Sequence, residues 1–334
     1  DRSVSRGLGD VYKRQYQEKY TDAKSELEKV ISSGKYDLIA DVSTFYHPAS
    51  AGCKEYVLEC VRHYDPSNMY SQEGWFGILA NWGFGYGFIA GPEASMHYKF
   101  NTTSGYSYFN PSKSLYDAFV AEEGADGYRL NAWIRTWEQV IAMNIAVNTT
   151  TNKYASEGYF RLKWLASTDD EFVGYWCGNQ SNTPVIRYAD VLLMAAEACL
   201  QAGDQAGADE YLGRVRDRAR LPRKSHVTLS DIKLERRLEL AMEGMRFQDL
   251  KRWGDAPAVL ADKGKKLPTF QIVPDPNNDL TTAAGIYNAR YTTKTTYVDN
   301  EKSLAGWTPN RDEWLPFPEN ELEVNSNLKQ NPGY

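Results

Sequence analysis

Three consecutive carboxylates are the first candidates for chemistry in this sequence: Asp169, Asp170 and Glu171. Two carboxylates can hydrolyse a glycosidic bond when they face each other across about 5–10 Å. Adjacent residues in a polar segment seldom reach that arrangement, so we expect a solvated turn or a helix cap. The 4 histidines show no metal-ligand spacing, and no G-x-S-x-G nucleophile motif occurs. We therefore predict no catalytic residue, no metal site and no cofactor.

Large aromatic rings gather in one glycine-rich part of the chain. Trp75, Trp82 and Tyr86 could stack on the flat apolar faces of sugar rings, while Asn81 or Glu73 meets the sugar hydroxyl groups. The alternative is that the same rings pin these segments to the hydrophobic core. We assign Trp75, Trp82, Tyr86 and Asn81 as the candidate ligand-binding residues.

Five further tryptophans are interpreted from their neighbours in the sequence. Trp176 and Trp307 are weaker candidates for a ligand site. Trp253 ends a helical charge pattern and is interpreted as a core residue. Trp133 and Trp137 are spaced as neighbours on one helix face, which also indicates a core position.

A charged run over 235–252 predicts a single buried helix with an ionic lattice. Glu235, Glu239 and Glu243 are four residues apart, so on a helix they line one face. Like charges at this spacing repel each other, so something cationic must lie against them. Three further charged residues continue at three-residue intervals and predict an acid–base ladder along the same helix: Arg246, Asp249 and Arg252. We expect this helix to stabilise the fold rather than to take a direct part in function.

The same run resembles a signature of the SusD/RagB family of bacterial outer-membrane nutrient-binding lipoproteins, E-R-x-x-E-L-x-x-E-G-x-R-x-x-D-L-x-R-W-G, which stands in full at 235–254. The tail LPFPENELEVNSNLKQNPGY is similar to the family ending P-I-P-x-x-E-[IL]-x-x-N-P-N-L-x-Q-N-P-G-Y. RYADVLLMAAEA at 187–198 resembles R-Y-A-E-V-L-L-x-x-A-E-A, and VRDRARL at 215–221 resembles I-R-x-R-A-G-L. Four ordered motifs thus resemble one family.

Three residues depart from the family pattern. Gly213 stands where Asn is usual, Ser326 where Pro is usual, and Arg220 where Gly is usual. Glycine at position 220 would supply the left-handed residue that ends a helix. Arg220 therefore departs from the glycine C-cap that the family pattern predicts for this helix end.

The resemblance implies a mostly α, SusD-like fold, with tetratricopeptide-like helices and long irregular loop insertions. It implies non-catalytic binding of an oligosaccharide or similar nutrient at the bacterial cell surface, for delivery to a SusC-like TonB-dependent outer-membrane transporter. It also implies a lipid anchor ahead of the present residues and an aromatic, loop-borne sugar platform. The alternative is a tetratricopeptide-type scaffold that binds proteins and no small molecule. An exposed aromatic shelf would favour the first function, and a bare concave helical groove the second.

Composition narrows the classes of partner. The chain has 334 residues, of which 42% are hydrophobic, enough for one large core or two smaller ones. Its net charge is −6 and it has no basic stripe, so we expect no nucleic-acid partner. No apolar run reaches transmembrane length. Cys199 is expected to be buried, whereas Cys53 and Cys60 could form a disulfide if their geometry allows it.

The beginning of the chain differs from the remainder. Residues 1–15 have almost no apolar periodicity and resemble a translated adaptor tail. We expect a non-native leader that packs on nothing, followed by one N-terminally truncated SusD/RagB-like domain at 16–334. A natural disordered leader is the alternative.

Periodicity and turn residues predict the secondary structure. Helices are expected over five segments: 20–32, 111–120, 131–139, 188–202 and 206–219. Residues 55–61 fit a short strand or a helix, and Thr228 with Asp231 fits a capping box. Residues 64–109 and 262–312 are expected to be mostly irregular.

Overall fold

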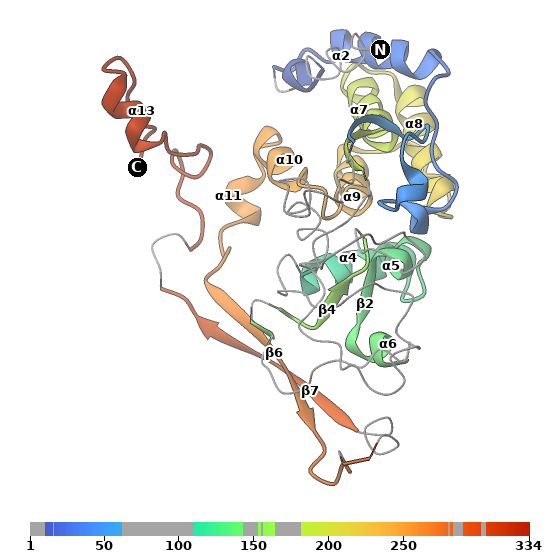
Figure 1. Cartoon of the computed structure of the whole chain (residues 1–334). Helices are drawn as coiled ribbons and strands as arrows, with labels where there is room; N and C mark the ends of the chain where they lie inside the picture. The colour runs from blue at the N-terminus through green and yellow to red at the C-terminus, as the bar shows by residue number, and fades with distance from the viewer. Residues whose placement is uncertain are drawn as a thin grey trace, which may run out of the picture.

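The computed structural model is a helical body with a long β-hairpin and a C-terminal arm that extend from it (Figure 1). The described residues are 11–15, 17–61, 110–142, 153–154, 156–163, 182–279, 281–282, 290–301 and 305–334. Helices account for most of the regular structure, which confirms the prediction of a mostly α fold.

The first hydrophobic core surrounds the helix pair α7 (Tyr188–Gln201) and α8 (Gln205–Arg218). α7 is apolar around most of its circumference, so neighbouring elements bury it on all sides. α2 (Tyr20–Ser32) packs its apolar stripe against α7. The turn between α7 and α8 contains Gly203 in the left-handed conformation that glycine adopts most easily. These three helices confirm the sequence predictions.

A second core lies between α4 (Lys113–Glu123), α5 (Tyr128–Trp133) and the short 3₁₀ helix η1 (Val42–Thr44). Phe119 meets the ring of Trp133 edge to face, with ring centroids 6.3 Å apart. A second 3₁₀ turn, η2 (Pro48–Ser50), follows η1. These elements surround one side of the helix that carries the glutamates.

The signature run forms two helices, so the prediction of a single helix over 235–252 is wrong. α9 spans Leu229–Glu239 and α10 spans Arg246–Arg252. Between them, Met242 and Gly244 have positive φ angles of 65° and 82°. A left-handed backbone cannot continue a right-handed helix, and glycine is the residue that enters it without steric cost.

The start of α9 follows the sequence prediction. The Thr228 hydroxyl accepts from the backbone N–H of Asp231, and the Asp231 carboxylate accepts from the backbone N–H of Thr228. This reciprocal capping box satisfies two donors that the first turn of a helix leaves free. It fixes the position at which α9 begins.

The predicted helix over 131–139 is also interrupted. α5 ends at Trp133, β2 (Ile134–Thr136) follows, and α6 (Trp137–Ala142) begins after it. β2 pairs antiparallel with β4 (Tyr159–Arg161). Because the partner strand lies well beyond the end of α6, a local helical pattern cannot show this pairing.

The ambiguous segment at 55–61 is a strand. β1 (Tyr56–Cys60) pairs antiparallel with β5 (Thr183–Arg187), with register shifts between Tyr56 and Glu59. β5 runs directly into α7, so this small sheet attaches residues 56–60 to the central helix pair.

The expectation that 262–312 is mostly irregular is wrong for two segments, 266–274 and 291–299. β6 (Lys266–Pro274) and β7 (Tyr291–Asp299) form a regular antiparallel hairpin of nine-residue strands. β3 (Lys153–Tyr154) adds a short third strand beside β6. The Thr-rich, largely exposed β7 lacks the apolar alternation that identifies a strand in sequence. Figure 1 shows the hairpin projecting from the helical body.

The last elements are short. α11 (Ala256–Val259) follows α10 after one turn, and α13 (Glu319–Val324) lies in the arm that ends the chain. The described residues of the arm are largely exposed. Figure 1 shows α13 standing away from the helical body.

The expectation that residues 1–15 pack on nothing is wrong for 11–15, and residues 1–10 lie outside the described part. Residues 11–15 are helical, Val11 is 1% exposed, and it belongs to the core around α7. The Gln15 amide donates to the backbone oxygen of Met194 at 3.0 Å, and the Tyr12 hydroxyl donates to Asp190. The native or foreign origin of this segment stays a prediction.

The end of α8 accommodates Arg220 where the family usually has glycine. Arg220 adopts φ 61°, and its N–H donates to the Asp217 oxygen while the Leu221 N–H donates to the Arg216 oxygen. These two bonds form a Schellman C-cap. The Arg220 guanidinium lies 3.7 Å from the ring centroid of Tyr128, which stabilises the strained conformation.

We predict that Arg220→Gly is more stable than Arg220→Ala by about 1 kcal/mol, because both lose the Tyr128 contact and only glycine relieves the left-handed strain. Urea unfolding of the two variants measures the difference. Equal stabilities, or a more stable alanine variant, would show that the residue carries no backbone strain.

Candidate functional site

The candidate ligand residues lie outside the described part of the chain. Trp75, Asn81, Trp82 and Tyr86 belong to 62–109, which is not among the described ranges. The carboxylates at 169–171 and Trp176 also lie outside them. Their assignment therefore stays a prediction. The geometry that follows is that of the helical body, whose described residues precede and follow these segments in the sequence.

The centre of that body is the carboxylate of Glu239, which is fully buried at the end of α9. It accepts from Arg129 at 3.0 Å, from Arg187 at 3.0 Å, and from Arg218. These three arginines come from α5, from the end of β5 and from α8. All three side chains are almost completely buried. One carboxylate thus joins four segments of the chain.

The network extends to two more glutamates through Arg187. Arg187 Nη1 lies 2.5 Å from Glu55 Oε1, and its Nε lies 2.8 Å from Glu243 Oε2. Arg218 also contacts Glu55, at 3.2 Å. Every nitrogen of the Arg187 guanidinium therefore donates to a glutamate carboxylate. The sequence prediction that cations must lie against the glutamates is confirmed.

A buried lysine completes the charge balance at the turn after α9. Lys163 Nζ donates to the backbone oxygens of Glu239 and Ala241 at 3.0 and 3.1 Å, and lies 2.5 Å from Glu243 Oε1. The ammonium also lies 3.7 Å from the Trp133 ring centroid. Burial lowers the pKa of Lys163 to about 8, against the opposing attraction of Glu243.

Two carboxylates in this network, Glu239 and Glu243, are held in their ionised form. Burial alone would raise the pKa of Glu239, but Arg218, Arg187 and Arg129 outweigh it and hold the pKa well below its usual range. The pKa of Glu243 is lowered in the same way, because Arg187 and Lys163 overcome the effect of burial. A general acid or base needs a pKa near the working pH and an accessible proton. These carboxylates have neither, so their role is structural.

Of the three i,i+3 pairs in the predicted ladder, the described residues form one. Arg252 contacts Asp249 at 2.9 Å, three residues earlier. Arg246 is half-buried and, among the described residues, forms no hydrogen bond or ion pair with Glu243 or Asp249. Because a turn separates α9 from α10, Glu243 does not lie on one helix with Arg246 and Asp249. The cations on the glutamates come from elsewhere in the chain.

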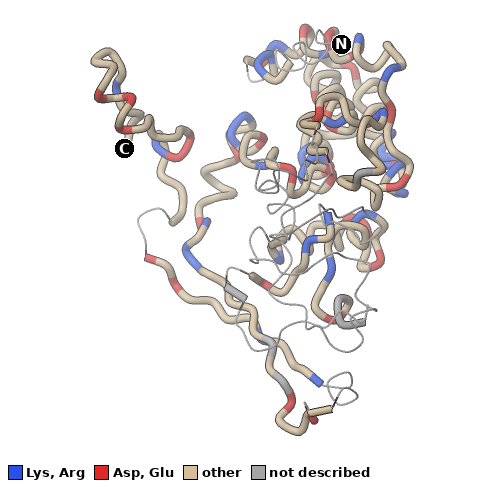
Figure 2. The backbone as a smooth tube through the Cα atoms, in the orientation of Figure 1, with Lys and Arg blue, Asp and Glu red and all other residues tan. Residues whose placement is uncertain are grey.

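A second ionic group fixes α10 to α7. Arg236 lies between Asp190 at 2.7 Å and Asp249 at 2.9 Å. Arg252 joins Asp249 to Glu197 of α7. Figure 2 shows acidic and basic residues interspersed over the helices of the body rather than gathered as a single-sign surface.

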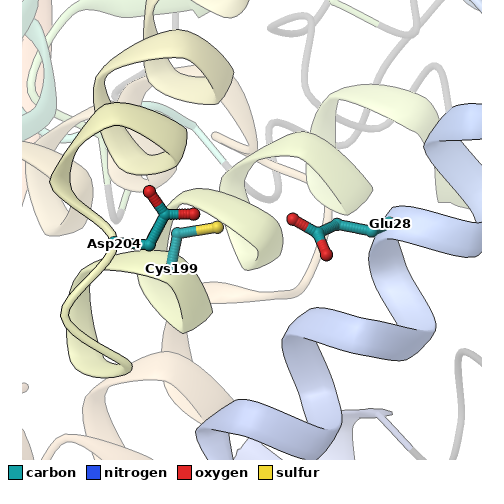
Figure 3. Close-up of side chains that lie close together, drawn as sticks. All are labelled: Glu28, Cys199 and Asp204. Atoms are coloured by element: carbon teal, nitrogen blue, oxygen red, sulfur yellow. The ribbon is translucent and has the colours of Figure 1, made fainter.

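The nearest approach to a metal-binding group within the described residues is Glu28, Cys199 and Asp204 (Figure 3). Glu28 reaches across from α2 toward the other two side chains. Lys24 Nζ already lies 2.6 Å from Asp204 Oδ2. Burial and the neighbouring Asp204 raise the pKa of Cys199 to about 12, so the thiol stays protonated at neutral pH. A metal ion requires a thiolate ligand and would have to displace the ammonium, so this group is an ion pair beside a buried thiol.

Three tryptophans predicted to lie in the core occupy two kinds of position. Trp133 and Trp137 are 1% and 5% exposed, which confirms that prediction. Trp253 is half-buried, and its indole N–H donates to Glu197 at 3.2 Å. It lies between the cations of Lys233 and Arg252. Trp253 therefore belongs to the edge of the body rather than to its interior.

The cysteines expected to form a possible disulfide are free. Cys53 is partly buried and Cys60 is exposed. Cys199 is buried and free, as predicted.

An aromatic group on α10 was missed from the sequence. Phe247 and Trp314 are 39% and 52% exposed, and the ammonium of Lys251 lies 5.3 and 5.5 Å from their ring centroids. Trp307, a weaker ligand candidate in the sequence, is half-buried against Phe247 at a centroid distance of 6.2 Å. The i,i+4 spacing of Phe247 and Lys251 was the available signal, but Trp314 is too distant in sequence to reveal the cluster.

Comparison with known proteins identifies a family over most of the chain. The model of the SusD family matches residues 54–334. A SusD-like protein of Bacteroides ovatus is 31% identical over 170 residues, 45% of this chain, and SusD-like protein P2 of Formosa agariphila is 32% identical over 194 residues, 53% of this chain. Each match covers 29% of the length of that relative.

Solved structures agree with this fold. A laminarin binding SusD-like protein superposes with a TM-score of 0.69 and 26% identity, covering 99% of this chain and 62% of that chain. Surface glycan-binding protein A from Bacteroides thetaiotaomicron, in complex with laminarihexaose, gives 0.68 at 23% identity, covering 96% of this chain and 62% of that chain, a likeness of fold alone. Within the described residues, every helix is too short or too polar to cross a bilayer.

We predict that Arg187→Met lowers the free energy of unfolding by about 3–5 kcal/mol, because it leaves Glu55, Glu239 and Glu243 buried with too little positive charge. Arg223→Met is the matched control. Arg223 forms ion pairs with Glu210 and Asp217 at the surface, and its loss is expected to cost no more than about 1 kcal/mol. Urea unfolding measures both, and equal costs would contradict a stabilising role for the buried network.

We also predict an acid limb in the stability. An unfolded glutamate has a pKa of about 4.3, whereas the folded pKa values of Glu239 and Glu243 are lower. The unfolded chain therefore binds protons that the folded chain does not. The contribution of these groups is complete above the unfolded pKa and is lost as the pH falls below it toward the folded pKa.

Urea midpoints between pH 7 and pH 3 measure this limb. Glu243→Gln should make it shallower, because one titrating group is removed. Glu210→Gln, at the exposed Arg223 ion pair, should leave its slope unchanged. A slope that both variants leave untouched would place the acid sensitivity outside this network.

Proposed function

We propose that this chain, which belongs to the SusD family, binds an oligosaccharide without catalysis. In this proposal the protein acts at the bacterial cell surface and delivers its ligand to a SusC-like TonB-dependent transporter in the outer membrane. The observation that carries the proposal is the likeness to a laminarin binding SusD-like protein over 99% of this chain at 26% identity. A β-glucan is accordingly the first ligand to test.

The proposed ligand surface is the aromatic group of Trp75, Trp82 and Tyr86, with Asn81 as a hydrogen-bonding partner. Aromatic rings provide flat apolar area for a pyranose ring, and an amide can both donate to and accept from hydroxyl groups. Each stacked ring adds only modestly to the free energy of binding. We therefore expect dissociation constants that are roughly micromolar to millimolar.

Glu239 and Glu243 are not placed to act as the acid of a glycosidase. The glutamates around Arg187 are occupied by guanidinium groups. A glycosidase needs one carboxylic acid with a raised pKa beside the bond that it cleaves. The pKa values of Glu239 and Glu243 are shifted in the opposite direction.

We predict that the protein binds laminarihexaose more tightly than glucose and releases no reducing ends from it. Trp75→Ala together with Trp82→Ala should abolish binding at this surface while the thermal melt stays nearly unchanged. Tyr297→Ala is the control, since Tyr297 is 50% exposed on β7. Equilibrium dialysis with labelled hexasaccharides of glucan, xylan and mannan measures binding, and a reducing-sugar assay measures hydrolysis.

The outcomes separate the competing functions. An unfolded double variant would place the two rings in the core and overturn the site assignment. Failure of the wild-type protein to bind any saccharide would favour a tetratricopeptide-type scaffold that binds protein. Release of reducing ends that is lost on Asp169→Asn or Asp170→Asn would replace binding by catalysis.

A further inference from the structure

The exposed face of α10 combines two aromatic rings with a cation that lacks an ionic partner. Phe247 and Trp314 flank the Lys251 ammonium at 5.3 and 5.5 Å from the ring centroids. No carboxylate among the described residues lies within ion-pair distance of Lys251. Its three N–H donors therefore remain available beside two apolar rings. The buried Arg129, Arg187 and Arg236, in contrast, are neutralised by carboxylates.

A second donor group lies on the neighbouring side of the same helix. Gln248 is exposed, and its side-chain amide makes no hydrogen bond within the described part of the chain. Together with Met245, Arg252 and Tyr12, it lines a cavity of about 290 Å³. The guanidinium of Arg252 already donates to Glu197 and Asp249, so its position at the edge of the cavity is fixed. This volume is just below the range of about 300–1,000 Å³ that is typical of ligand pockets.

The ring of Phe247 is supported by a neighbouring tryptophan. Trp307 packs against Phe247, and the indole Nε1 of Trp307 is buried without a hydrogen-bond partner in the described structure. A buried indole N–H normally finds an acceptor. This nitrogen is inaccessible from the surface, so Trp307 supports the ring of Phe247 and is not a donor open to a ligand. The cluster therefore combines exposed rings with the donors of Lys251 and Gln248, which are i,i+3 neighbours on α10.

We infer that this cluster, formed by Phe247, Trp314, Lys251 and Gln248, is a second saccharide-binding site. The ligand class is a hydroxyl-rich pyranose unit, which stacks its apolar face on a ring and accepts from Lys251 and Gln248. A protein partner fits less well, because a stable protein interface needs about 800 Å² on each side and a core with few charges. The cluster has at its centre a cation without an ionic partner among the described residues, which the core of such an interface seldom contains.

The inference rests on the proposed function, because it takes the ligand to be a glycan. It places a site on α10 and the C-terminal arm, separate in sequence from the aromatic segment around Trp75 and Trp82. Two sites that contact one polysaccharide would raise its apparent affinity above that for a short oligosaccharide.

The experiment compares variants by equilibrium dialysis with labelled laminarihexaose, cellohexaose, maltohexaose and xylohexaose. The site variants are Phe247→Ala with Trp314→Ala, and separately Gln248→Ala with Lys251→Met; the second pair leaves the packing of Phe247 on Trp307 in place. Leu315→Ala is the matched control, because Leu315 is 80% exposed beside Trp314 and carries no ring. Thermal melts and light scattering accompany each measurement.

The expected result is about two bound hexasaccharides per wild-type chain. For either site variant, the affinity at α10 should fall about tenfold or more, which leaves about one bound hexasaccharide, while Leu315→Ala behaves as wild type. The Trp75→Ala and Trp82→Ala variant should retain the site on α10.

Three outcomes would overturn the inference. If both site variants bind as wild type, the cluster takes no saccharide, and the proposed function stands on the other aromatic group. If they change the oligomeric state without changing saccharide binding, the cluster is a contact between proteins. If the wild-type protein binds none of the four saccharides, the inference and the proposed function fail together.

Discussion

The arrangement depends on the buried carboxylate of Glu239. A carboxylate removed from water is very unfavourable unless cations and hydrogen-bond donors surround it. Here Arg129, Arg187 and Arg218 provide both, from segments that are up to 110 residues away in sequence. The segments must meet at this point for the charge to be tolerated. The network therefore selects one packing of the helices, in addition to any stability it contributes.

This constraint also fixes the elements on either side of two connecting segments. Residues 62–109 lie between β1 and α4, and the network reaches both elements. Glu55, just before β1, contacts Arg187 and Arg218, and Glu123, at the end of α4, contacts Arg129. Residues 164–181 follow Lys163, which is held by Glu243, and precede β5, which ends at Arg187. A surface that binds saccharide through few contacts benefits from attachment points that are fixed before binding.

The sequence predicted the helices whose information is local. α2, α7, α8 and the start of α9 follow apolar periodicity and a capping box, and the structure confirms them. The break after Glu239 depends on a left-handed turn at Met242 and Gly244, which a charge pattern does not show. β2 and the hairpin β6–β7 depend on pairing with distant strands. Similarly, spacing showed that the glutamates needed cations, but not which residues supply them.

The site was less accessible to prediction than the fold. The aromatic assignment at Trp75 and Trp82 rests on residue type, and both residues lie outside the described part of the chain. The cluster on α10 is formed by Phe247 and Trp314, which are far apart in sequence and meet on either side of Lys251. Such a pair leaves no local pattern, because each ring alone is typical of a core or surface position.

Hydrogen exchange of the backbone amides in Arg187→Met and wild-type protein tests the central claim most directly. If the network around Glu239 joins distant segments, this one substitution should reduce protection together in β1, α5 and α9 as well as in β5. Arg223→Met should leave all four elements protected. Loss of protection confined to β5 and the first turn of α7 would show that Arg187 acts locally, and would contradict the account.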